Sequence, residues 1–313
     1  MKLIFMGTMR FAVPILEMLQ EQAEIMLVVT QPDRPFGRKR ELKASPVKEK
    51  ANELGIPVFQ PESIRKEQNV ILNMQPDVIV VAAYGQMIPN TILEHPTHGC
   101  INVHASLLPK LRGGAPMHKA IQQGFETTGV TVMKMAMKMD SGAVYATAST
   151  PIDDMDDVGS LEERLSHMGA NLLKKVLPEI LDGSLLPTPQ EESEVTFAYN
   201  IKREEERVSF AGSARSVFNH VRGYHPWPLT DLEIDGQIIK LYRVSIVDET
   251  KVVSSHPGEI IGVGKDYVHI QANPGIVGLE YVQLQGKSPM EIRAFLAGSG
   301  KSLFQVGKIV NSL

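Results

Sequence analysis

The chain has 313 residues, of which 43% are apolar and 22% are charged, and its formal net charge is −4. These values are typical of a globular protein long enough for two domains, and they exclude a general, charge-driven affinity for nucleic acid. The only cysteine, Cys100, excludes an internal disulfide and a thiolate metal cluster. No run of the chain reaches the ~18 apolar residues that a membrane helix needs, so we expect a cytoplasmic protein.

The first thirty residues have the pattern of a β-α-β unit. Short apolar runs at residues 3–6 and 25–30 are typical of buried parallel strands, and residues 11–19 have the spacing of an amphipathic helix. The turn after the first strand holds a single glycine, Gly7. The three-glycine fingerprint of dinucleotide-binding proteins is therefore absent, which argues against a nicotinamide or flavin enzyme.

Residues 31–44 are predicted to form a long loop. Pro35 and Gly37 interrupt both helix and strand periodicity, and a helix resumes where Ser45 and Pro46 match a helix start. Five basic side chains lie on this segment, at Arg34, Arg38, Lys39, Arg40 and Lys43. A solvated surface is one interpretation of these charges, and an arm that docks on phosphate groups is the other.

Asn102 and His104 fall on the same face of a predicted strand that ends before Ser106, because side chains alternate along a strand. Polar groups at the carboxyl end of a strand lie where open α/β sheets bind ligands. Asp140 follows a second apolar run, residues 130–139, and could reach His104 if the two strands are neighbours. An amide, an imidazole and a carboxylate together suit transfer of an acyl or formyl group to an amine. A structural histidine and a turn-forming aspartate are the alternative.

Three runs of sequence carry a resemblance that bears on this choice. The runs NVHASLLP at 102–109, RGGAP at 112–116 and MDSG at 139–142 are similar to the signature of the folate-dependent formyltransferases. In that family these motifs supply three catalytic residues, which the resemblance places at Asn102, His104 and Asp140. It further implies a Rossmann-like sheet and no catalytic metal.

The same resemblance implies a binding site for the pterin of the folate. Its walls would follow the strand predicted at residues 77–83 and the strand that carries His104. The residues implied are Tyr84, Gly85, Met87, Ile88, Ser106, Leu107, Leu108 and Pro109. Tyr84 and Met87 could instead be ordinary core residues.

The basic loop resembles an insertion found in those family members that act on methionyl-tRNA. Formyltransferases that act on small substrates lack it. The resemblance implies 10-formyltetrahydrofolate as formyl donor and methionyl initiator tRNA as acceptor, with the loop arginines and lysines at the acceptor end of the tRNA. The alternatives are a formyltransferase for a sugar nucleotide or another small amine, and an RNA-binding protein on an inactive scaffold. We expect a monomer.

The rest of the chain predicts a second, smaller domain. A strand at 143–152 leads into a long helix, for which Ser160 and Glu163 match a capping box, and the Pro- and Glu-rich residues 186–195 are typical of a linker. A helix at 211–222 and five short strands follow, two of them around an Asp235-Gly236 turn, and a final helix is predicted from Ser288.

The predicted class is therefore α/β, with a Rossmann-like, mostly parallel sheet domain followed by a small OB-like β-barrel. We expect a catalytic domain at residues 1–187, a linker at 188–205 and a tRNA-binding domain at 206–313. Nine basic residues could line a tRNA-facing surface there: Lys202, Arg203, Arg207, Arg215, Arg222, Lys240, Arg243, Lys287 and Arg293.

Overall fold

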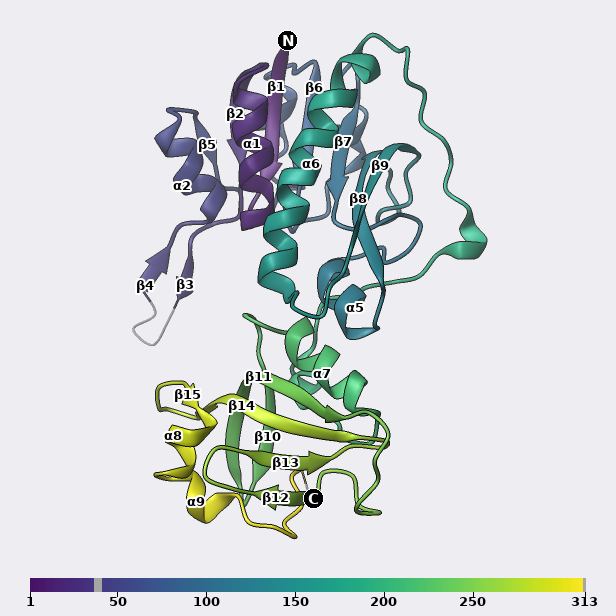
Figure 1. Cartoon of the computed structure of the whole chain (residues 1–313). Helices are drawn as coiled ribbons and strands as arrows, with labels where there is room; N and C mark the ends of the chain where they lie inside the picture. Colours follow the sequence, from purple (N-terminus) through teal and green to yellow (C-terminus); the bar gives the residue numbers. More distant parts are fainter. Residues whose placement is uncertain (37–40, 312–313) are drawn as a thin grey trace. The chain divides into compact units, whose positions relative to one another are not determined.

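The computed structural model describes residues 1–36 and 41–311, and its internal contacts divide the chain into two units, each with its own sheet (Figure 1). The first unit comprises Met1–Pro116, Thr127–Pro151 and Leu161–Tyr199. The second comprises Met117–Glu126, Ile152–Ser160 and Asn200–Leu313. No helix in the described part of the chain is both long and apolar enough to cross a membrane.

A seven-stranded sheet with the order β5-β2-β1-β6-β7-β8-β9 forms the centre of the first unit. Its strands are β1 (Lys2–Gly7), β2 (Glu24–Val29), β5 (Val58–Phe59), β6 (Val78–Ala82), β7 (Cys100–His104), β8 (Thr127–Lys134) and β9 (Val144–Pro151). The first five in the sheet order run parallel, β8 runs antiparallel to β7, and β9 runs antiparallel to β8. The predicted Rossmann-like, mostly parallel sheet is confirmed. The strand order reverses between β1 and β6, which is where such sheets bind ligands.

Helices cover both faces of this sheet (Figure 1). On one face, α6 (Val158–Leu181) packs against α1 (Val13–Gln20) and β7. A Cβ atom on Gly169 of α6 would lie only 2.8 Å from Val103 Cγ1, so the close approach needs a glycine. On the other face, α3 (Asn69–Leu72) and α4 (Asn90–Leu93) supply Ile71 and Ile92 to an apolar core with Ile79 of β6.

The structure corrects the prediction of a loop at residues 31–44. β3 (Arg34–Phe36) and β4 (Glu41–Lys43) form a two-stranded antiparallel ribbon in which Pro35 is paired with Leu42. Each strand of such a ribbon is an edge strand, where a proline is tolerated because its missing N–H need not break a ladder. The helix start is confirmed: α2 (Pro46–Glu53) is capped by Ser45, whose hydroxyl accepts a hydrogen bond from the Lys48 N–H at 3.0 Å.

Two other boundaries differ from the prediction. The strand before Asp140 ends at Lys134, and the cap of α6 lies three residues earlier than Ser160. The Ser160 N–H donates to Asp157 Oδ1 at 2.8 Å, and the Asp157 N–H donates to Ser160 Oγ at 3.2 Å. This reciprocal pair satisfies two N–H groups at the helix start, so serine takes the third helical position rather than the cap.

The second unit contains an antiparallel sheet with the order β10-β11-β14-β13-β12, to which β15 adds beside β14. The strands are β10 (Thr230–Ile234), β11 (Gln237–Asp248), β12 (Ile260–Val263), β13 (Val268–Gln271), β14 (Ile276–Leu284) and β15 (Met290–Glu291). Three register shifts where β11 pairs with β14 bend the sheet, as a small barrel requires. This agrees with the barrel-like domain that was predicted.

Local signals in the second unit are partly confirmed. Asp235 and Gly236 have φ values of 50° and 72°, as a two-residue hairpin turn requires. The helix predicted from Ser288 begins only at Ile292, because residues 290–291 pair with β14 first. The remaining helices and turns are η1 (Arg10–Ala12), α5 (Pro116–Gln122), η2 (Glu192–Glu194), η3 (Arg203–Glu206), α7 (Ala214–Gly223), α8 (Ile292–Leu296) and α9 (Gly300–Leu303).

The buried centre of β6 allows a test of the first core. Ile79 is 0% exposed, and Ile79→Ala should lower the free energy of unfolding by about 2–5 kcal/mol, because truncation leaves a cavity. The same kind of truncation at Val70, which is 42% exposed, should change it by no more than about 0.5 kcal/mol. Urea unfolding followed by circular dichroism measures both values. A loss below about 1 kcal/mol at Ile79 would contradict the close packing described here.

Candidate active site

The candidate site lies at the carboxyl end of β7, between β6 and β8. Val103 contacts α6, so Asn102 and His104 project from the opposite face of the sheet. Both residues are 7% exposed. Within the described residues, no hydrogen bond involves the Asn102 side chain, so its amide is available to a ligand.

The imidazole of His104 has two different neighbours. Nε2 lies 3.1 Å from the carbonyl oxygen of Leu111, which can only accept, so Nε2 carries a proton. Nδ1 lies 3.8 Å from Asp140 Oδ2, which is too far for a direct hydrogen bond, although one water molecule beside the pair could contact both atoms. Nδ1 is therefore the ring nitrogen that is left to contact a ligand.

Asp140 is held in place by the backbone of the segment that follows His104. Its Oδ2 accepts a hydrogen bond from the Gly113 N–H at 2.9 Å, and its side chain is 15% exposed. The residue itself has a φ of 47°, an uncommon conformation for a non-glycine residue. Because β7 and β8 are neighbours, with His104 opposite Thr131, the structure brings the imidazole and the carboxylate together.

The loop after β7 is tied to β8. Thr131 Oγ1 accepts from the Leu108 N–H at 3.1 Å and donates to the Ser106 carbonyl at 2.7 Å. Ser106 Oγ also donates to the Lys110 carbonyl at 2.7 Å. Residues 106–109 therefore have a fixed backbone beside the catalytic candidates, whereas Leu107 and Pro109 are only half-buried.

The segment after β6 links the carboxyl ends of three strands. The carbonyl oxygen of Tyr84 accepts hydrogen bonds from Thr8 Oγ1 at 2.8 Å and Gln31 Nε2 at 3.3 Å. The side chains of Tyr84 and Ile88 belong to the apolar core, and burial raises the pKa of Tyr84. Met87 is 68% exposed, so among these side chains it is the one that faces outward.

Of the five predicted tRNA-binding residues, the structure describes two, and both lie on the β3–β4 ribbon. Arg34 lies 3.8 Å from Glu62 with both side chains exposed, and Lys43 at the end of β4 is also exposed. Arg38, Lys39 and Arg40 lie outside the described residues.

The base of this ribbon is anchored by Asp33. Its carboxylate accepts hydrogen bonds from Lys48 at 2.7 Å and Gln60 at 2.8 Å. These two bonds lower the pKa of Asp33, so the carboxylate stays ionised at neutral pH. The ribbon is thus joined at its start to α2 and to the segment after β5.

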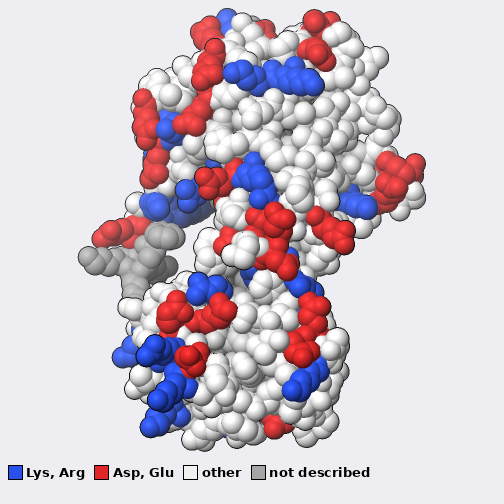
Figure 2. All heavy atoms as spheres, in the orientation of Figure 1, with Lys and Arg blue, Asp and Glu red and all other residues white. Residues whose placement is uncertain are grey.

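In the second unit, most of the predicted basic surface is neutralised. Figure 2 shows Lys and Arg side chains interspersed with Asp and Glu on the face drawn. Five of the nine basic residues proposed above form ion pairs: Arg207, Arg215, Arg222, Lys240 and Arg243. Lys287 and Arg293 are exposed and have no ion pair with another described residue.

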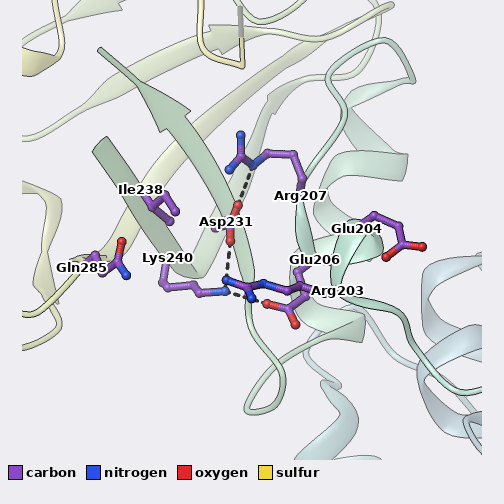
Figure 3. Close-up of a pocket in the computed structure, with 8 residues that line it drawn as sticks. All are labelled: Arg203, Glu204, Glu206, Arg207, Asp231, Ile238, Lys240 and Gln285. Carbon is purple, nitrogen blue, oxygen red and sulfur yellow. Dashed lines mark hydrogen bonds and ion pairs between the residues drawn. The ribbon is translucent and has the colours of Figure 1, made fainter. Parts of the chain in front are cut away.

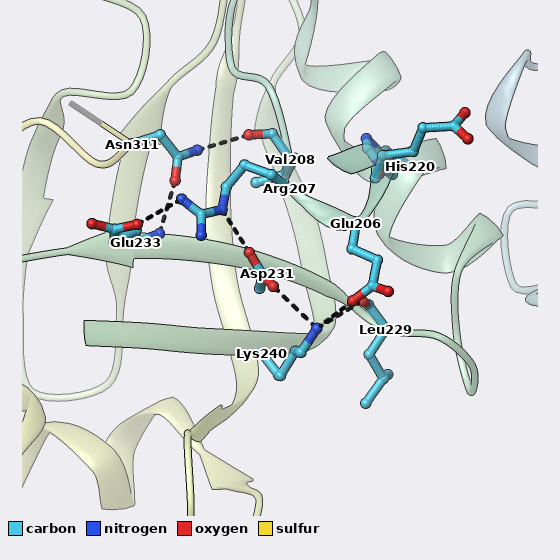
Figure 4. Close-up of polar contacts among 10 residues, drawn as sticks. Glu206, Arg207, Val208, His220, Leu229, Asp231, Glu233, Lys240 and Asn311 are labelled. Atoms are coloured by element: carbon cyan, nitrogen blue, oxygen red, sulfur yellow. Dashed lines mark hydrogen bonds and ion pairs between the residues drawn. The ribbon is translucent and has the colours of Figure 1, made fainter. Parts of the chain in front are cut away.

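A cavity of about 480 Å³ in this unit shows how acidic side chains neutralise basic ones (Figure 3). Its wall holds three basic side chains, Arg203, Arg207 and Lys240, and three acidic ones, Glu204, Glu206 and Asp231. Figure 4 shows how they connect: Asp231 accepts from Arg207 at 2.6 Å and from Lys240 at 3.0 Å, and Lys240 also reaches Glu206 at 2.9 Å. The cavity therefore has no net charge to attract a phosphate group.

Sequence reasoning missed Gln190, which it assigned to a linker. In the structure Gln190 Nε2 donates to the carbonyl oxygens of Asp140 and Gly142, both at 2.8 Å. A glutamine between prolines and glutamates carries no signal of such a contact. Among the described residues, no cluster of three potential metal ligands occurs.

Comparison with known proteins places these features in a family. The chain matches the model described as formyl transferase over residues 1–177 and the formyl transferase C-terminal domain over residues 200–300. Methionyl-tRNA formyltransferase of Geobacillus thermodenitrificans (strain NG80-2) is 45% identical over 306 residues, covering 96% of this chain and 95% of the relative. The enzyme of the same name from Bacillus mycoides (strain KBAB4) is 46% identical over 306 residues, with 96% of both chains covered.

Solved structures share the fold at low sequence identity. The N-formyltransferase of Helicobacter canadensis, in complex with folinic acid and dTDP-3-aminofucose, has a TM-score of 0.69 at 16% identity, over 89% of this chain and 98% of that chain. HypX of Aquifex aeolicus, in complex with tetrahydrofolic acid, has a TM-score of 0.63 at 16% identity, over 99% of this chain and half (50%) of that longer chain. Both family models match in order and the relatives match along nearly the whole length, so this chain belongs to the formyl transferase family, within its group of methionyl-tRNA formyltransferases.

Proposed function

We propose that the protein transfers the formyl group of 10-formyltetrahydrofolate to the α-amino group of methionyl initiator tRNA. The observation that carries this proposal is the convergence of Asn102, His104 and Asp140 at the end of β7. It occurs in a chain that is 45% identical to a methionyl-tRNA formyltransferase along nearly its whole length. The product, N-formylmethionyl-tRNA, serves translation initiation, and we place the reaction in the cytoplasm with a monomeric enzyme.

The first step is attack of the amine on the formyl carbon. A C–N bond forms, and the formyl oxygen becomes an oxyanion that needs hydrogen-bond donors. The free amide of Asn102 supplies one donor. The second is Nδ1–H of protonated His104, because Nε2–H is already donated to Leu111. The 3.8 Å between Nδ1 and Asp140 Oδ2 is too long for a direct hydrogen bond, so Nδ1–H is available to the oxyanion.

The second step moves a proton and breaks the bond to the folate. Asp140, with one oxygen held by the Gly113 N–H, accepts the proton of the attacking amine through a water molecule. The tetrahedral intermediate then collapses, the bond between the formyl carbon and N10 of the folate breaks, and N10 takes up the proton. Asp140 and His104 thus have separate tasks, since a single Nδ1–H cannot serve both the carboxylate and the oxyanion fully.

The folate would meet backbone groups more than aromatic side chains. Tyr84 and Ile88 are part of the core, so in our proposal their segment contributes the backbone at Gly85 and the exposed side chain of Met87. The fixed backbone of residues 106–109 supplies the polar contacts. The formyl transferase family model, together with a tetrahydrofolate complex among solved structures of the same fold, supports a folate-derived donor.

The tRNA is assigned to two regions of the chain. We propose that residues 1–187 carry the catalytic site and that residues 206–313, joined by residues 188–205, bind tRNA. Arg34, Arg38, Lys39, Arg40 and Lys43 are the further tRNA contacts that we propose. Since the cavity of the second unit is electrically balanced, the exposed Lys287 and Arg293 are the better candidates there for phosphate contacts.

One assay separates this proposal from its rivals. The protein is incubated with 10-formyltetrahydrofolate and, in parallel, methionyl initiator tRNA, methionyl elongator tRNA or a dTDP-amino sugar. We expect formylation of the initiator tRNA, measured as formylmethionine released from the tRNA. Formylation of the sugar alone would overturn the tRNA assignment, and formylation of no acceptor would overturn the activity.

Removal of the donors tests the mechanism. His104→Ala should lower kcat by about 10²–10⁴-fold, because the ionised donor is lost. Asn102→Ala should lower it by about 10²–10³-fold, which is typical of one oxyanion donor. His167→Ala changes the same residue type at an exposed position of α6 and should leave kcat unchanged. Unchanged circular dichroism is required of all three variants, and normal turnover of His104→Ala would refute the mechanism.

A triple alanine variant tests whether the basic segment contacts tRNA; it replaces Arg38, Lys39 and Arg40. Each lost phosphate contact should lower the slope of log KM for tRNA against log salt concentration by about 0.7–0.9, since fewer counterions are released. The matched control replaces Arg65, Lys66 and Lys175, which are exposed, and so changes the net charge equally. Equal slopes for the two triple variants would exclude the ribbon from the tRNA contact.

A further inference from the structure

The segment that follows β9 and α6 in the chain returns to the candidate site. Thr188 pairs with Val144 through two backbone hydrogen bonds of 2.8 Å. Farther along, the Arg112 N–H donates to the Thr196 carbonyl at 2.9 Å, and the Ala198 N–H donates to the Arg112 carbonyl at 2.7 Å. Residues 188–198 are therefore fixed at both ends within the first unit.

Gln190 lies between these two attachments, and its whole amide is used. Nε2 donates one hydrogen to the carbonyl of Asp140 and the other to the carbonyl of Gly142. Oε1 accepts from Arg112 Nε at 3.1 Å and from Arg112 Nη2 at 2.9 Å. The reverse orientation of the amide would set its oxygen against two carbonyls, so the four partners settle which atom is nitrogen.

Arg112 is a charged residue with an exposed fraction of 0%. Its Nη2 also pairs with Glu192 at 2.8 Å, and hydrogen bonds from Arg112 and Lys138 lower the pKa of Glu192, which keeps that carboxylate ionised. A buried guanidinium is costly unless it is paired and hydrogen-bonded. Arg112 directly precedes Gly113, whose N–H holds the Asp140 carboxylate.

These contacts close a ring. Asp140 is bound through its carboxylate to Gly113 and through its carbonyl to Gln190, and Gln190 is bound to Arg112, the neighbour of Gly113. The ring encloses the residue with the left-handed φ of 47°. Such a conformation persists only where the surroundings hold it.

We propose that Gln190 is a positioning residue, which holds Asp140 in its strained turn so that the carboxylate faces His104 and the attacking amine. The inference rests on the proposed function, because it assigns Asp140 a part in the reaction. Gln190 need not touch either substrate. Its loss should therefore lower kcat and leave KM for both substrates nearly unchanged.

Gln190→Glu is the sharpest variant, because it has the same shape and keeps the acceptor for Arg112. It replaces the two donors that hold the carbonyls of Asp140 and Gly142 with an oxygen that can only accept, and it adds one negative charge. We expect kcat to fall by about 10–100-fold with both KM values within about 2-fold, as for a misplaced catalytic group. Gln22→Glu makes the same chemical change at an exposed position of the first unit and should leave kcat unchanged.

A double-mutant cycle separates positioning from general structural support. In an Asp140→Asn background, Gln190→Glu should cost less than about 2-fold further, because the group that it positions is already altered. A further loss as large as in the wild-type background would overturn the proposal, and so would full activity of the single variant. If Gln190→Glu lowers Tm by more than about 5 °C, Gln190→Asn, which adds no charge, replaces it in the same cycle.

The wild-type assay keeps the two proposals distinguishable. A wild-type protein that formylates no methionyl-tRNA refutes the proposed function. A wild-type protein that formylates it, together with a fully active Gln190→Glu, refutes only the role of Gln190.

Discussion

The hydrogen bond between the Gly113 N–H and the Asp140 carboxylate is the contact on which the geometry of the site depends. Leu111, two residues earlier, holds the imidazole of His104 through its carbonyl, so one short segment orients both the ring and the acid. Only glycine fits at position 113 of this segment. Its φ is 129°, and a Cβ would lie 2.5 Å from the carbonyl oxygen of Ala198. The arrangement of the proposed catalytic groups is thus maintained by backbone groups, which do not change rotamer.

The arrangement also divides the chemistry between the side chains. A carbonyl acceptor at Nε2 removes one ring nitrogen from proton transfer, and the distance at Nδ1 keeps the carboxylate from taking the other permanently. Asn102 adds a neutral donor that needs no change in protonation. In a nearly buried site these dipoles act in a low dielectric, where preorganised donors contribute most to stabilising an oxyanion. The proposed catalytic groups come from the end of β7 and from the loop after β8, two strands that are neighbours in the sheet.

The sequence predicted what depends on local pattern. Alternation placed Asn102 and His104 on one face, and the Asp235-Gly236 pair predicted a hairpin, because both signals are properties of a few adjacent residues. It failed where the structure depends on which residue becomes the partner, whether that partner is near or far in the chain. Pro35 looked like a strand breaker until its pairing with Leu42 was known, and Ser160 looked like a helix cap although Asp157 takes that place. Gln190 could not be found, since its partners lie 50 and 78 residues away in the chain.

The charge pairing of the second unit has a consequence for which nucleic acids bind the protein. Arg207 and Lys240 are bound to carboxylates, and the net charge of the chain is −4. The described part of the second unit therefore offers few unpaired basic side chains that could displace counterions from an arbitrary nucleic acid. Other nucleic acids, which offer the same phosphate backbone, then compete weakly for the protein. Because few positive charges are unpaired, more of the protein stays unbound and available to its acceptor tRNA.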